Sequence, residues 1–188
     1  RQRQMCIRDR DGRDPNDLNI RMKTQPYAIL CSDDDGVVVE GFDYFATTFR
    51  LDDCDGSEIR NSTLLYPSTS KRSLGYAGED MDNRYVSRVD DCIGCLVDRC
   101  DFLYTDGAAF EAHGGASSSQ NNTINNSYFY HIDWSGSDQK SLMTTIMMDG
   151  TTNRFTNNTM HKTGTSATIR IGNAPQIMFN EIYDTAYI

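Results

Sequence analysis

Two aspartates occupy the same position after two copies of a repeated sequence pattern. Asp106 and Asp133 each follow the last apolar residue of their copy by four positions, and His131 and Lys162 follow theirs by two. If the copies stack in space, the two carboxylates lie within one or two strand spacings of each other. Neighbouring carboxylates repel, so one of them holds its proton more tightly, which suits a general acid beside an ionised partner. The pair could equally bind a cation, or simply cap turns.

A second group of polar residues lies on short strands that precede the copies. Alternation in FEAHG (110–114), IMMDG (146–150) and TIRIG (168–172) turns the apolar residues inward. The outward positions then carry groups suited to acid–base chemistry or to binding an anion: Glu111, His113, Asp149 and Arg170. Charged outward residues are also normal on a solvated sheet, so an ordinary surface is the alternative.

The repeated pattern itself predicts the architecture. An apolar residue is followed three positions later by a small or amide residue, and five positions later by a second apolar residue. It occurs five times: Ile59/Ser62/Leu64, Val97/Cys100/Phe102, Ile124/Ser127/Phe129, Phe155/Asn158/Met160 and Ile177/Asn180/Ile182. The copies start 38, 27, 31 and 22 residues apart, so the unit is constant while the connections vary. A repeat of this kind is typical of a solenoid.

Short apolar segments separated by Gly, Asn, Asp, Ser and Thr predict strands rather than helices. Each coil is expected to consist of strand, turn, strand, bend, strand and a variable loop. We expect the bend at the small or amide position, because Asn tolerates a left-handed backbone and stacked Asn side chains can hydrogen-bond along a column. An antiparallel sandwich would instead need a hairpin turn about every 8 to 12 residues.

The cysteines and the acidic clusters have structural and metal-binding interpretations. Cys54 and Cys92 occur in the matching strings LDDCDGSEI (51–59) and VDDCIGCLV (89–97). Stacking puts them about 4.8 Å apart, which a disulfide accepts. Cys92, Cys95 and Cys100 lack the second pair of ligands that a structural zinc site needs. Stacked core cysteines are therefore favoured, and a Cys54–Cys92 disulfide is the alternative. The Asp clusters do not match the EF-hand spacing, although stacked turns could share Ca²⁺.

The arrangement of strands, bends and loops resembles the right-handed parallel β-helix of the pectate-lyase-like superfamily, over roughly residues 36–188. We therefore expect an all-β, single-stranded, right-handed solenoid. The resemblance implies a polysaccharide groove along the first strand of each coil. It also implies either β-elimination or hydrolysis of an extracellular polysaccharide. The alternative is a non-catalytic surface adhesin or polysaccharide-binding scaffold.

Each reaction would use a different set of residues. Elimination needs a base and neutralisation of the uronate carboxylate, often by Ca²⁺, and the matching candidates are His131, Lys162 and Arg170. Hydrolysis needs two carboxyl groups in opposite protonation states, and the matching candidates are Asp106, Asp133 and Glu111. Candidate sugar contacts are Trp134 in the long loop 131–143, together with His113, His161 and Asp149. The alternative for Trp134 is packing of the loop onto the coil.

The composition bounds the partners and the location. The net charge of −9 argues against nucleic acid and an anionic membrane as partners. No run of 18 apolar residues is present, so a membrane span is not expected. We expect a monomer that is secreted, periplasmic or displayed at the cell surface. The first ten residues, RQRQMCIRDR, resemble translated sequencing-adapter read-through, so the β-helix domain is expected over 11–188, truncated at its C-terminus.

Overall fold

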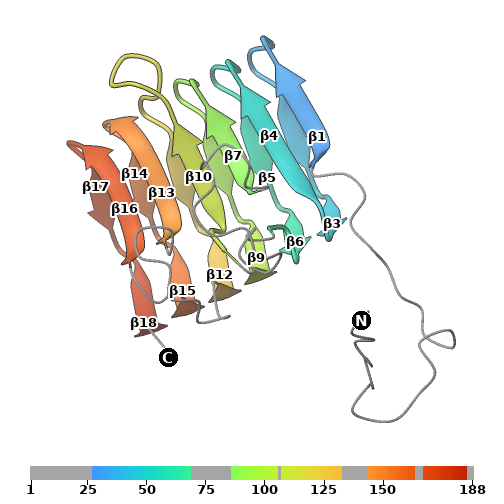
Figure 1. Ribbon diagram of the computed structural model, residues 1–188, viewed down its shortest axis with the longest axis vertical. Coiled ribbons are helices and arrows are strands. Elements are labelled where there is room, and N and C mark those ends of the chain that lie inside the picture. Colours follow the sequence, from blue (N-terminus) through green and yellow to red (C-terminus); the bar gives the residue numbers. More distant parts are fainter. Residues whose placement is uncertain (1–26, 69–85, 106, 133–143, 164–166, 186–188) are drawn as a thin grey trace, which may run out of the picture.

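The computed structural model describes residues 27–68, 86–105, 107–132, 144–163 and 167–185. These residues form 18 short β-strands and no helix. The strands repeat in triplets along the chain, and each triplet makes one coil, so that six coils stack along one axis (Figure 1). The prediction of an all-β parallel β-helix is confirmed, and the alternative of an antiparallel sandwich is wrong. The segment 1–10, predicted to be foreign to the domain, lies outside the described residues.

Equivalent strands of successive coils pair in parallel and build three sheets of six strands each. Sheet 1 contains β1 (Tyr27–Ser32), β4 (Thr48–Asp52), β7 (Ser87–Asp90), β10 (Phe110–His113), β13 (Thr144–Thr151) and β16 (Ala167–Asn173). Sheet 2 contains β2 (Val38–Glu40), β5 (Glu58–Arg60), β8 (Leu96–Asp98), β11 (Thr123–Asn125), β14 (Arg154–Thr156) and β17 (Gln176–Met178). Sheet 3 contains β3 (Asp43–Phe45), β6 (Thr63–Leu65), β9 (Asp101–Thr105), β12 (Tyr128–Ile132), β15 (Thr159–Thr163) and β18 (Glu181–Thr185).

The two apolar positions of the sequence repeat supply the inward columns of sheets 2 and 3. In sheet 2, Ile59 pairs with Val97 and Val97 pairs with Ile124, and all three are buried. In sheet 3 the rings of Phe102 and Phe129 stack with their centroids 4.8 Å apart. Sheet 1 adds the inward residues expected from alternation, which are buried or pack against the core: Phe110, Ala112, Ile146, Met148, Ile169 and Ile171.

The bend between sheets 2 and 3 lies one residue earlier than predicted. The left-handed residues are Asn61, Arg99, Asn126, Asn157 and Phe179, with φ between 49° and 59°. The small or amide residue that follows points inward and fills the corner of the coil. Its side chain accepts a hydrogen bond from the backbone of the preceding coil, as Ser127 Oγ does from Cys100 N (3.1 Å) and Asn158 Oδ1 from Ser127 N (2.8 Å). The predicted column of hydrogen bonds is therefore confirmed, although its residues are not the bend itself.

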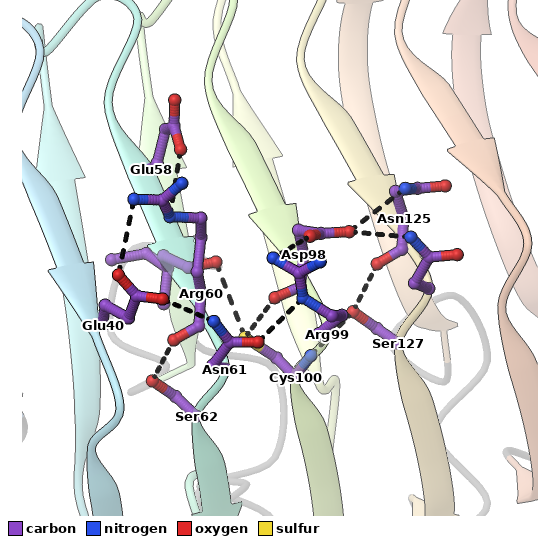
Figure 2. Close-up of polar contacts among 12 residues, drawn as sticks. Glu40, Glu58, Arg60, Asn61, Ser62, Asp98, Arg99, Cys100, Asn125 and Ser127 are labelled. Carbon is purple, nitrogen blue, oxygen red and sulfur yellow. Dashed lines mark hydrogen bonds and ion pairs between the residues drawn. The ribbon is translucent and has the colours of Figure 1, made fainter.

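The outer face of sheet 2 and its corner are occupied by polar contacts between coils (Figure 2). Arg60 pairs with Glu58 at 3.2 Å and with Glu40 of the preceding coil at 3.5 Å. The Asn61 amide donates to Glu40 at 2.6 Å and accepts a hydrogen bond from Arg99 at 2.7 Å. These contacts connect successive coils along the axis, which is a structural role.

The five described cysteines line the interior as free thiols. Cys54, Cys92, Cys95 and Cys100 are buried, and Cys31 is half-buried. The backbone N–H of Cys54 donates to Cys92 Sγ at 3.1 Å, so the two residues do lie one coil apart as the matching strings predict. They are not joined by a disulfide. The interpretation as stacked core cysteines is confirmed.

Candidate functional site

The structure separates the predicted site residues into two groups. Glu111 and His113 on β10, Asp149 on β13 and Arg170 on β16 belong to sheet 1. His131 on β12, and His161 and Lys162 on β15, belong to sheet 3. Asp106, Asp133 and Trp134 lie outside the described residues. The three residues proposed for elimination are therefore split between two sheets, with Arg170 apart from His131 and Lys162.

His113 is held between two carboxylates on the outer face of sheet 1. Alternation along β10 puts Glu111 and His113 on the same side, and His113 Nε2 lies 2.9 Å from Glu111 Oε2. On the other side of the ring, His113 Nδ1 lies 3.6 Å from Oδ2 of Asp149, on the next strand of the sheet. The side chains of Glu111, His113 and Asp149 are 1%, 21% and 38% exposed. The imidazole thus connects a buried carboxylate with an accessible one.

This geometry gives the imidazole a defined chemical role. In the tautomer whose Nε2–H donates to Glu111, the lone pair of the ring is on Nδ1. A neutral imidazole with a lone pair at the surface can take a proton from a bound molecule. The carboxyl group of Asp149 beside it is exposed to solvent. The three groups can therefore act as a general base with a buried orienting partner.

Four charged residues that the sequence analysis did not select extend this cluster along sheet 1. The carboxylate of Asp90 receives Arg88 Nε at 3.1 Å and Arg50 Nε at 2.8 Å, and Arg50 also contacts Asp52 at 3.0 Å. Arg88 pairs in register with Glu111, and Asp90 with His113. The signal was present as Arg-x-Asp-Asp-Cys in both matching strings, RLDDC (50–54) and RVDDC (88–92). Alternation alone puts each Arg and the first Asp on one face.

Arg170 lies at the far end of the same face. In register, Glu111 pairs with Met147, and Met147 pairs with Arg170. Two strand spacings of about 4.8 Å put the backbone of Arg170 about 9.6 Å from that of Glu111. Arg170 is exposed, whereas Met147 between them is buried. The side chain of Arg170 is therefore long enough to bring its accessible guanidinium close to the His113 site.

No family model, curated protein or solved structure matches this chain. Among the described residues, no three His, Cys, Asp or Glu side chains are arranged to hold a metal ion, and Ca²⁺ stays a prediction. In the same part of the chain, no helix is long and apolar enough to cross a membrane.

The second group of predicted residues lies where the chain leaves sheet 3. His131 and Lys162 have left-handed backbones, with φ of 58° and 56°, and occupy one column with Tyr66, Tyr104 and Asp184, which are also left-handed. The sequence position two residues past the repeat is thus a second bend. It has a backbone role that does not depend on the chemistry of the side chain.

The side chains of this group contact aromatic rings and each other. His161 Nε2 lies 3.0 Å from Asp184 Oδ2, and Lys162 Nζ lies 5.7 Å from the centre of the Tyr130 ring. Burial lowers the pKa of His131, and the nearby charges of Lys162 and His161 lower it further. His131 is therefore favoured in its neutral form in the folded protein.

Proposed function

We propose that this β-helix is a carbohydrate-active enzyme, a polysaccharide lyase that acts as a monomer on an extracellular uronate-containing polymer. The observation that carries the proposal is the position of His113 between buried Glu111 and accessible Asp149 on the outer face of sheet 1. The resemblance to the pectate-lyase-like superfamily supports it, because that resemblance implies a sugar-binding groove on the first sheet.

Burial favours elimination over hydrolysis at this site. A hydrolase needs two carboxyl groups that both face the scissile bond. Glu111 is 1% exposed, so its carboxylate reaches a bound sugar only through the His113 ring. A base needs only one group that the sugar can reach, and the His113 side chain, which is 21% exposed, provides it.

The reaction follows from the roles of these groups. His113 Nδ1 takes the proton from the carbon next to the uronate carboxylate. The electron pair of that C–H bond forms a carbon–carbon double bond, and the adjacent bond from carbon to the glycosidic oxygen breaks. The departing oxygen takes a proton from solvent, which leaves one chain with an unsaturated uronate and one with a free hydroxyl. Arg170 is the candidate to bind the uronate carboxylate, whose negative charge grows as the proton leaves.

The test is an incubation of the protein with a panel of uronate-containing and neutral polysaccharides. The expected result is an increase in the ultraviolet absorbance of unsaturated uronate with at least one uronate polymer. His113→Ala is expected to lower the rate by about a hundredfold or more. Arg170→Gln is expected to weaken substrate binding and raise KM. Glu58→Gln is the matched control, because it removes a carboxylate on sheet 2, far from the proposed site.

The other outcomes identify the competing functions. New reducing ends without the ultraviolet signal would indicate a hydrolase and would overturn the role of His113 as the eliminating base. Absence of product with every polymer would favour the non-catalytic scaffold. A His113→Ala variant as active as the unmodified protein would place the catalytic residues elsewhere.

A further inference from the structure

Sheet 3 carries a continuous row of aromatic rings on its outside. We define the aromatic strip as Phe45, Tyr66, Tyr104, Tyr130, His161 and Tyr183. Consecutive ring centroids along it are 5.9, 5.9, 5.3, 5.1 and 4.3 Å apart. The strip has one ring from each of the six coils, on β3, β9, β12, β15 and β18 or, for Tyr66, directly after β6; these strands lie side by side in Figure 1.

Four of the six rings are exposed, and Tyr130 and His161 are half-buried. Phe45, Tyr66, Tyr104 and Tyr183 are 50%, 48%, 37% and 40% exposed. Contiguous exposed apolar surface is uncommon on a soluble protein unless it contacts another molecule. Cross-strand ring pairs also stabilise a sheet, but that role does not require four of the six rings to be exposed. The strip therefore has the features of a binding surface.

From these features we propose that the aromatic strip binds a carboxylate-bearing glycan chain that runs along the axis of the β-helix. The apolar face of a pyranose ring packs on a flat aromatic ring, and its hydroxyl groups hydrogen-bond at the edges. Successive coils rise by about 4.8 Å, close to the length of one sugar unit. Rings on successive coils, with centroids 4.3 to 5.9 Å apart, can thus contact successive units of one chain.

Charge selects the glycan and orients it. Lys162 is exposed, lies over Tyr130, and has no carboxylate within ion-pairing distance among the described residues. The neighbouring Asp184 is already paired with His161 at 3.0 Å. On the opposite edge of the strip, Asp101 and Glu181 begin their strands. A glycan carboxylate is therefore attracted to the Lys162 edge, and the hydroxyl groups face the acidic edge.

This surface is separate from the His113 site, and the proposal does not need catalysis there. It rests on the proposed function only for the class of polymer, a uronate-containing chain. A strip that holds the polymer without cleaving it would raise the local concentration of substrate. Binding and turnover are thus expected to be lost in different variants.

The experiment measures binding of uronic acid oligosaccharides of increasing length by titration calorimetry, with carboxyl-reduced oligosaccharides as the neutral comparison. Asn is the replacement of choice at left-handed positions, because it tolerates that backbone. Tyr66→Asn and Tyr104→Asn combined are expected to weaken binding by about tenfold or more. Lys162→Asn is expected to weaken binding of the acidic oligosaccharides and to leave the weaker binding of the reduced ones unchanged.

Two controls keep the result interpretable. Phe179→Asn removes an 82% exposed ring at a left-handed position outside the strip, and its affinity should equal that of the unmodified protein. Glu58→Gln removes a carboxylate on sheet 2, outside both sites, and should bind the acidic oligosaccharides normally. Unchanged affinity in the double tyrosine variant, with a normal unfolding midpoint, would overturn the proposal. Equal loss in Phe179→Asn would also overturn it, as would the same affinity for acidic and reduced oligosaccharides.

Discussion

His113 Nε2 lies 2.9 Å from Oε2 of Glu111, two residues earlier on the same strand. Glu111 is almost completely buried, and the His113 side chain is 21% exposed. Of the two side chains, the imidazole of His113 is therefore the one that a bound molecule can reach. The buried carboxylate acts on a bound molecule only by setting the orientation and tautomer of that ring.

Replacing Glu111 with Gln tests this positioning role. The amide keeps the size of the side chain but removes the negative charge that holds the Nε2 proton. We expect kcat toward a cleaved uronate polymer to fall by about tenfold or more, with KM little changed. Steady-state kinetics separate the two constants. A parallel rise in KM with normal kcat would show that Glu111 affects binding instead.

The sequence predicted the shared face of this pair but not its burial. Alternation in FEAHG puts Glu111 and His113 on the outside of the coil, and the structure has them there. How exposed an outward residue is depends on what packs over it, and the periodicity of one strand carries no such information. The same limit applies to Arg88, which is outward and 6% exposed.

Asn158 is expected to be important for stability. It is 1% exposed, its Oδ1 accepts from Ser127 N at 2.8 Å, and its Nδ2 donates to Ile124 O at 3.0 Å. Asn158→Ala leaves both backbone groups without their partner in the interior. We expect a loss of about 2–4 kcal/mol in the free energy of unfolding, measured by urea denaturation.

Asn157→Gly is the matched control for Asn158→Ala. Asn157 is the exposed neighbour, with φ of 55°, and glycine keeps that backbone accessible. Only its hydrogen bond to Asn125 is lost, at the surface. If Asn157→Gly lost as much free energy of unfolding as Asn158→Ala, the buried hydrogen bonds of Asn158 would not be the source of the stability.

The bend between sheets 2 and 3 was predicted one residue too late, for a physical reason. Asn at the left-handed position is a recognisable signal in Asn61, Asn126 and Asn157. Arg99 and Phe179 occupy the same position in other coils, and neither favours a left-handed backbone. The buried Ser, Cys and Asn residues at the next position are more uniform in size, and the bend was therefore predicted at that position.

Gly150 is expected to be intolerant of any side chain. Its φ is 92°, and a Cβ atom there would lie 1.9 Å from the backbone oxygen of Ser119. Gly150→Ala is expected to cost about 3 kcal/mol or more, since backbone must move to remove the overlap. Gly94→Ala is the comparison: its φ is 74°, but nothing lies within 4 Å of the added atom. It should cost only about 1–2 kcal/mol. Equal losses in thermal unfolding would show that strain, not overlap, dominates at Gly150.

The candidate site was predictable in part because the repeat gives a register. It aligned β10, β13 and β16, and so brought Glu111, Asp149 and Arg170 onto one face. The register did not reveal that His131 and Lys162 lie apart from these residues, at the end of sheet 3. The position of a loop residue relative to a sheet depends on loop conformation, which a fixed offset in sequence does not specify. Asp106 and Asp133 were selected on such an offset.

His131 is expected to make the stability dependent on pH. Its pKa in the folded protein is lowered by burial and by the charges of Lys162 and His161, so the unfolded chain binds a proton more readily. The stability that His131 contributes is therefore fully present above its unfolded-state pKa of about 6.5. It is lost as the pH falls through the lower pKa of the folded protein. His131→Asn removes the titrating group and keeps the left-handed backbone. We expect the unmodified protein to lose free energy of unfolding relative to His131→Asn between about pH 8 and pH 5.

Lys162→Asn removes one cause of the pKa shift of His131, so the same difference in free energy should shrink in that background. A difference between the two proteins that stays constant with pH would show that His131 titrates alike in the folded and unfolded states.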